Sequence, residues 1–191
     1  MGALTETTAR STSPVPQEAR KRDSSAQYLT FMLSGEVFSI PILPIREIIQ
    51  YGELTEVPMM PSFIRGVINL RGKVVPVIDL NARFGRDLTA VARRTSIIII
   101  EMTDKEDVSV QAMGVMVDAV NEVVDIADAD IEPPPSFGAR IRPDFIGGMA
   151  KHQGRFMVLL DLTQVLSVAE MTSLGQSLTG VAATQEQEYE R

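Results

Sequence analysis

The side chains that most often carry enzyme chemistry are scarce in this sequence. Cysteine is absent, and His152 is the only histidine among the 191 residues. Without cysteine the chain cannot form disulfides, thiolate zinc sites, iron–sulfur clusters or thiol nucleophiles. With one histidine it cannot build a metal centre on two or three histidines. His152 itself precedes Gln153 and a glycine, a setting typical of a surface turn.

Two stretches have the composition of ligand-binding loops but not the spacing. Residues 66–73 (GVINLRGK) place five residues between their glycines and have no Ser or Thr after the lysine, whereas a phosphate-binding loop needs four and a hydroxyl. Residues 125–132 (DIADADIE) lack the central glycine and the late glutamate of a calcium loop. A solvated loop or strand edge is the favoured interpretation of the acidic stretch. We therefore expect no cofactor, no metal and no enzymatic activity.

Charge and hydropathy limit the classes of partner that the chain is expected to bind. The chain is 45% apolar and 23% charged, as in an average soluble domain, and its net charge is -7. An acidic chain does not present the broad basic face that nucleic acids require. The longest aliphatic run is the four isoleucines at 97–100, far too short to cross a bilayer, and the first residues do not resemble a secretory signal. We expect a cytoplasmic protein with no nucleic-acid partner and no direct membrane insertion.

Short apolar runs broken by glycine predict a mostly β fold between two tails. Residues 1–26 are polar and aperiodic and are predicted to be a disordered tail, and residues 167–191 a short helix followed by a flexible tail. Four pairs of β-rich runs flank turn signals: 28–33 with 37–42, 67–70 with 74–78, 96–102 with 110–117, and 149–151 with 156–160. This pattern favours a sandwich or a barrel architecture.

An internal repeat is the strongest feature of the sequence. Residues 63–72 (FIRGVINLRG) lead through a strand to Asp79, and at a shift of 82 residues Phe-Ile, two glycines and Asp-Leu recur at 145–162. Upstream, residues 45–48 resemble 120–123, so about eight residues near 138–145 are inserted in the second copy. The repeat predicts two similar halves, 27–94 and 95–166, each too small to be stable alone and therefore sharing a core.

Positions that both copies keep are expected to be structural. Phe63 and Phe145 are then core anchors, and Gly72 and Gly154 lie where a hairpin turn needs positive φ. Asp79 and Asp161 each precede a short helical stretch. The favoured role of both aspartates is to cap that helix, in preference to acting as catalytic carboxylates.

Positions that the copies do not share are the better candidates for function. Arg65 is replaced by glycine in the second copy, and Arg71 by glutamine. The first half carries a charge of +2 and the second -7, as expected if they face different partners. Met59 and Met60 follow a proline in a loop, where they serve either as an adaptable binding surface or as ordinary core fillers.

The repeat motif identifies a family resemblance. Residues 63–72 (FIRGVINLRG) followed by 75–80 (VPVIDL) closely resemble the central motif of the CheW-like chemotaxis coupling proteins, and residues 27–33, 42–48, 114–118 and 145–148 fit the same pattern in order. The resemblance covers about residues 27–166. It implies an all-β fold of two SH3-like five-stranded β-barrels around a shared core, with short helices and flexible termini, and it implies no reaction.

The resemblance also implies partners and contact residues. CheW-like proteins couple the cytoplasmic tip of methyl-accepting chemotaxis receptors to the regulatory domain of the histidine kinase CheA, in arrays at the membrane. Ile45, Glu47, Arg65 and Arg71 match positions of receptor or kinase contact. We expect Glu47 and Arg71 to pair across neighbouring strands and to orient the guanidinium toward a partner, the alternative being an exposed pair with no binding role.

A second kinase contact is implied at Phe137. Glu132 stands where the family often has a basic residue, so the charge pairing at this second interface is expected to differ. Two other functions stay open on the sequence alone. One is an adaptor of the same fold for a receptor pathway outside chemotaxis, and the other is a β-barrel that binds a small ligand.

Overall fold

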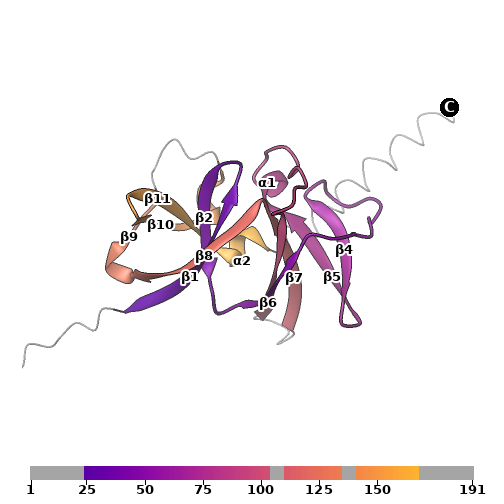
Figure 1. Ribbon diagram of the computed structural model, residues 1–191, viewed down its shortest axis with the longest axis horizontal. Coiled ribbons are helices and arrows are strands. Elements are labelled where there is room, and N and C mark those ends of the chain that lie inside the picture. Colours follow the sequence, from indigo (N-terminus) through magenta and orange to yellow (C-terminus); the bar gives the residue numbers. More distant parts are fainter. Residues whose placement is uncertain (1–23, 104–109, 135–140, 168–191) are drawn as a thin grey trace, which may run out of the picture.

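The computed structural model describes residues 24–103, 110–134 and 141–167 (Figure 1). Residues 1–23 and 168–191, most of the predicted tails 1–26 and 167–191, lie outside the described residues. The strands are β1 (Ser25–Leu33), β2 (Glu36–Pro41), β3 (Ile45–Gln50), β4 (Ile64–Leu70), β5 (Lys73–Asp79), β6 (Ser96–Thr103), β7 (Val110–Val117), β8 (Ala119–Ala127), β9 (Ile131–Glu132), β10 (Ile146–His152) and β11 (Arg155–Leu160). The helical segments are α1 (Leu80–Arg83), η1 (Asp128–Asp130), η2 (Pro143–Phe145) and α2 (Leu162–Val165).

These strands form two sheets, which confirms the predicted all-β class of two SH3-like barrels. The first barrel has the strand order β3-β6-β7-β5-β4, and the second has β8-β1-β2-β11-β10-β9. The second sheet thus has six strands where five were predicted, and its edge strand β9 has only two residues. They lie side by side in Figure 1, with α2 between them. No described helix is long and apolar enough to span a bilayer.

The two sheets do not follow the two sequence halves. The hairpin β1–β2, from the first half, lies in the second barrel, where β2 runs parallel to β11. The hairpin β6–β7, from the second half, lies in the first barrel, where β7 runs parallel to β5. The boundary at 94/95 therefore separates the copies of the repeat but not the barrels. Each copy gives its leading hairpin to the barrel of the other copy.

The first strand also begins earlier than the sequence predicted. Ser25 and Ala26, which were assigned to the tail, pair with Ala127 and Ile126 of β8. Neither residue carries a periodic apolar signal. A partner about 100 residues away supplies their hydrogen bonds, so no local pattern could mark them as part of a strand.

The repeat is visible strand by strand. The β4–β5 hairpin and α1 correspond to the β10–β11 hairpin and α2, and β3 corresponds to β8, since each of these two is the edge strand next to a long hairpin. The N–H of Asp79 donates to the carbonyl of Phe63 at 2.8 Å, and the N–H of Asp161 donates to that of Phe145 at 2.9 Å. The bridge between Thr55 and Val67 takes the place of the pairing between β9 and β10.

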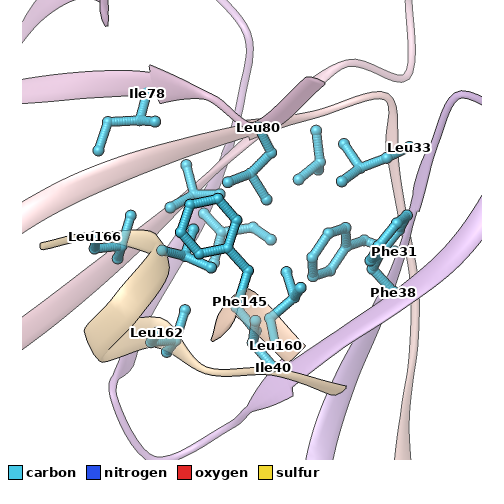
Figure 2. Packing of buried hydrophobic residues seen from close by; sticks show 14 of the residues in the cluster. Phe31, Leu33, Phe38, Ile40, Ile78, Leu80, Phe145, Leu160, Leu162 and Leu166 are labelled. Carbon is cyan, nitrogen blue, oxygen red and sulfur yellow. The ribbon is translucent and has the colours of Figure 1, made fainter. Parts of the chain in front are cut away.

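The shared core joins the two barrels. Its largest cluster combines residues of both sheets with both short helices, and Figure 2 shows Phe31 and Phe38 of the second barrel in one cluster with Phe145, Ile78 and Leu80. Phe145 is completely buried and Phe63 nearly so, as predicted for the two repeated anchors. The buried Arg83 guanidinium lies 5.1 Å from the centroid of the Phe63 ring and 4.8 Å from that of Phe145, so one cation packs against both rings.

Asp79 and Asp161 are the helix caps that the repeat predicted. Asp79 accepts hydrogen bonds from the backbone N–H groups of Asn81 and Ala82, and Asp161 accepts from those of Thr163 and Gln164. Their surroundings differ, however. Asp79 is fully buried and also accepts from the N–H and the hydroxyl of Thr89, both at 2.8 Å, whereas Asp161 is half-buried.

This difference predicts unequal costs for removing the two caps. Asp161→Ala should lower the free energy of unfolding by about 1 kcal/mol, the usual cost of a lost cap. Asp79→Ala also leaves the buried N–H and hydroxyl of Thr89 without an acceptor, and should cost about 3 kcal/mol. Urea unfolding of both variants measures the difference. Equal losses would contradict the structural role assigned to Thr89.

Candidate functional site

A groove of about 1140 Å³ opens on the first barrel between β3 and the β4–β5 hairpin, and we call it the first groove. Its floor is apolar and is formed by strands β4 to β7. The floor residues include Ile64, Leu70, Val75, Ile78, Ile99, Ala112 and Met113. Charged side chains surround this floor, namely Arg46, Glu47, Arg71, Lys73 and Glu101. The combination of an apolar floor and a charged rim suits a protein or peptide ligand.

The wall of the first groove is a loop of proline and methionine. Residues 58–61 line it, and the side chains of Met59 and Met60 are 60% and 47% exposed. Val74 of β5, which also lines the first groove, is 71% exposed. Large apolar side chains are usually buried, and several exposed ones around one hollow mark a contact surface. Of the two roles that the sequence left open for these methionines, the structure shows a surface position.

Two ion pairs cross the rim. Nη2 of Arg71 lies 3.2 Å from Oε2 of Glu47, and Nε of Arg46 lies 3.0 Å from Oε1 of Glu101. The pairing of Glu47 with Arg71 was predicted, but these residues do not lie on neighbouring strands. Glu47 lies in β3 and Arg71 in the turn that follows β4, and β3 and β4 are the two ends of the five-stranded sheet. The pair therefore spans the gap between the two edges of the curved sheet, at the mouth of the groove.

The β4–β5 turn fixes the position of Arg71. Arg71 and Gly72 have φ of 53° and 82°, the two positive values that a two-residue type I′ hairpin requires. The side-chain oxygen of Asn69 accepts a hydrogen bond from the N–H of Gly72 at 2.9 Å. The motif Asn-Leu-Arg-Gly thus encodes a tight turn in which Asn69 holds the backbone and Arg71 is presented to solvent, with 81% of its side chain exposed.

The other predicted contact residues do not gather in this groove. Ile45 is half-buried and packs against the shared core, and Arg65 is half-buried in β4 outside the groove lining. Glu132 lies exposed in β9, paired with Met149 on the second barrel. Phe137 lies outside the described residues. The structure thus brings together Glu47 and Arg71 alone among the predicted set.

Three charged residues of the rim were missed from the sequence. Arg46, Lys73 and Glu101 differ from Asn121, Arg155 and Met32 at the equivalent positions of the second barrel, as the pairings of the corresponding strands show. The first of these differences lies within the matched stretches 45–48 and 120–123, so the comparison of the two copies could have identified Arg46. Glu101 carried no such signal, because its hairpin belongs to the other copy.

This arrangement defines a class of protein: a two-barrel scaffold with a peptide-sized groove. The profile of the CheW-like domain matches residues 27–170. The chain is 31% identical over 145 residues to the chemotaxis protein CheW of Klebsiella aerogenes, covering 76% of this chain and 84% of that protein. It is 32% identical over 138 residues to CheW of Bacillus subtilis, covering 72% and 85%.

A solved structure agrees with these sequence matches. The crystal structure of the scaffolding protein TtCheW from Thermoanaerobacter tengcongensis superposes with a TM-score of 0.66 at 34% identity, covering 76% of this chain and 90% of that one. The chain therefore belongs to the CheW-like domain family.

The exposure of the rim predicts that its ion pair contributes little to folding. Glu47→Gln and Arg71→Gln should each change the free energy of unfolding by less than about 1 kcal/mol, because solvent screens a pair at the mouth of the groove. A double-mutant cycle in urea measures the coupling between the two side chains. A coupling well above 1 kcal/mol would show that the pair holds the barrel together.

Proposed function

We propose that this chain is a non-enzymatic adaptor that couples the cytoplasmic tip of a methyl-accepting chemotaxis receptor to the regulatory domain of the histidine kinase CheA. It would act in the cytoplasm, at receptor arrays. Membership of the CheW-like family and the names of its relatives support this function. The single observation that carries it is the first groove, whose apolar floor and charged rim can accept one face of a helix.

The chemistry of the groove fits the tip of a receptor hairpin. A helix that docks in a groove places apolar residues spaced by three or four on the floor and leaves polar residues at the rim. Met59 and Met60 can adjust their rotamers to such a face, because an unbranched thioether tolerates many shapes. Arg71 can exchange part of its contact with Glu47 for a carboxylate of the partner, since a guanidinium offers five donors.

The four residues implied by resemblance then divide into three roles. Glu47 and Arg71 would contact the partner directly at the rim. Ile45 would act through the shared core, since its side chain packs there, and Arg65 would contact a partner beside the groove. Glu132 is exposed on the second barrel, where it can meet a second kinase module, and Phe137 is assigned to that contact by resemblance only.

Charge reversal at the rim tests this function. Arg71→Glu places a second carboxylate beside Glu47, so the mouth of the groove repels an acidic partner, and covering it with an apolar partner costs the desolvation of both carboxylates. We expect binding to a receptor cytoplasmic fragment or to CheA to weaken by at least about tenfold, and kinase activation in a reconstituted mixture of receptor, CheA and this protein to fall accordingly.

A matched control separates this effect from a change in net charge. Arg93→Glu makes the same substitution on an exposed loop residue outside the first groove. It should leave binding and activation within about twofold of the unmodified protein, and both variants should unfold at nearly the same urea concentration. Normal activation by the Arg71→Glu protein would contradict the role of the first groove.

A further inference from the structure

The second barrel carries its own groove at the position equivalent to the first groove. It has a volume of about 580 Å³ and lies between β8 and the tip of the β10–β11 hairpin, and we call it the second groove. The repeat relates the two linings residue by residue: Glu122 stands at the position of Glu47, Gln153 at that of Arg71, and Arg155 at that of Lys73. The duplication has thus produced two hollows of common origin on one chain.

The contact that crosses the mouth differs between the two grooves. In the second groove Glu122 faces His152, with 3.8 Å between Oε1 and Nε2, and this distance is too long for a hydrogen bond. Nε2 of His152 has no hydrogen-bond partner among the described residues. The mouth therefore lacks the direct ion pair that joins Glu47 to Arg71 in the first groove.

The second groove is also lined by two arginines that form no ion pair with a described residue. Arg94, from the loop before β6, and Arg155, from β11, both line it. Within the described part of the chain neither guanidinium forms an ion pair, whereas Arg46 and Arg71 of the first groove both do. Among the described residues of the lining, Glu122 is the only acidic one. Two arginines of the lining that have no ion-pair partner among the described residues form a local positive site on a chain of net charge -7.

An apolar anchor lies beside these cations. The ring of Phe156 is 59% exposed at the edge of the second groove, with Nζ of Lys151 5.9 Å from its centroid. Met32 and Val37 are half-buried in the lining next to the buried Met157. An exposed aromatic ring beside arginine is the composition that dominates binding energy at protein interfaces.

From these contacts we propose that the second groove docks an acidic segment of a protein partner. Its carboxylates bind Arg94 and Arg155 in charge-assisted hydrogen bonds, and an adjacent apolar side chain packs on Phe156. This site is separate from the first groove, so the chain can hold both partners together.

Two peptides test the proposal on the full chain. One has twelve residues with alternating glutamate and leucine and one central phenylalanine, and the other has glutamine in place of every glutamate. Calorimetry gives the affinities, and the ring resonances of His152 report occupancy, because the chain has no other histidine. We expect the acidic peptide to shift these resonances and to bind at least about tenfold more tightly than its glutamine counterpart.

Variants assign the binding to one groove. Arg155→Glu should weaken binding of the acidic peptide by about tenfold or more, and Arg93→Glu, an equal charge reversal on an exposed residue outside both groove linings, should leave its affinity within about twofold. Absence of binding, equal binding of the two peptides, or unchanged binding by the Arg155→Glu protein would overturn the proposal. Sedimentation of the chain alone provides a further check, since self-association that Arg155→Glu abolishes would make a second copy the occupant and would also overturn it. None of these results depends on receptor or kinase, so the first groove is tested independently.

Discussion

The exchange of hairpins between the two copies is the constraint on which the rest of the structure depends. Strand β2 pairs with β11 and β7 pairs with β5, each in parallel, so both barrels contain strands from both ends of the chain. The largest apolar cluster then closes over residues of both barrels. A half of about 70 residues is marginal alone. Here neither barrel can form without the other half, and the two grooves are fixed relative to each other.

Duplication followed by divergence explains why the two hollows differ. The backbone of each is set by equivalent parts: an edge strand, a hairpin with a two-residue turn, and a capped helix. These parts depend on residues that both copies keep, such as Gly72 and Gly154. The rims are free to change, because an exposed side chain at the mouth contributes little to folding. Charge and shape at the mouth can therefore be selected for binding alone.

Local features of the fold could be read from the sequence, and long-range ones could not. The hairpin turns, the caps at Asp79 and Asp161 and the buried Phe145 depend on residues close in sequence or repeated at a fixed interval. The hairpin exchange has no such signal, since swapped and unswapped barrels place the same residues in the same strands. The pairing of Glu47 with Arg71 could be predicted from the sequence. That the pair joins the two edges of one sheet could not, because this geometry depends on how far the sheet curves.

The β4–β5 turn both closes a hairpin and presents Arg71 to a partner. Positive φ at Arg71 and Gly72, together with the hydrogen bond from Gly72 to Asn69, leaves the turn one conformation. A guanidinium on such a turn loses less backbone entropy on binding than one on a loose loop. The contact with Glu47 then selects among the remaining side-chain rotamers. The affinity of the first groove for its partner should thus depend more on the rigidity of the β4–β5 turn than on the strength of the ion pair between Glu47 and Arg71.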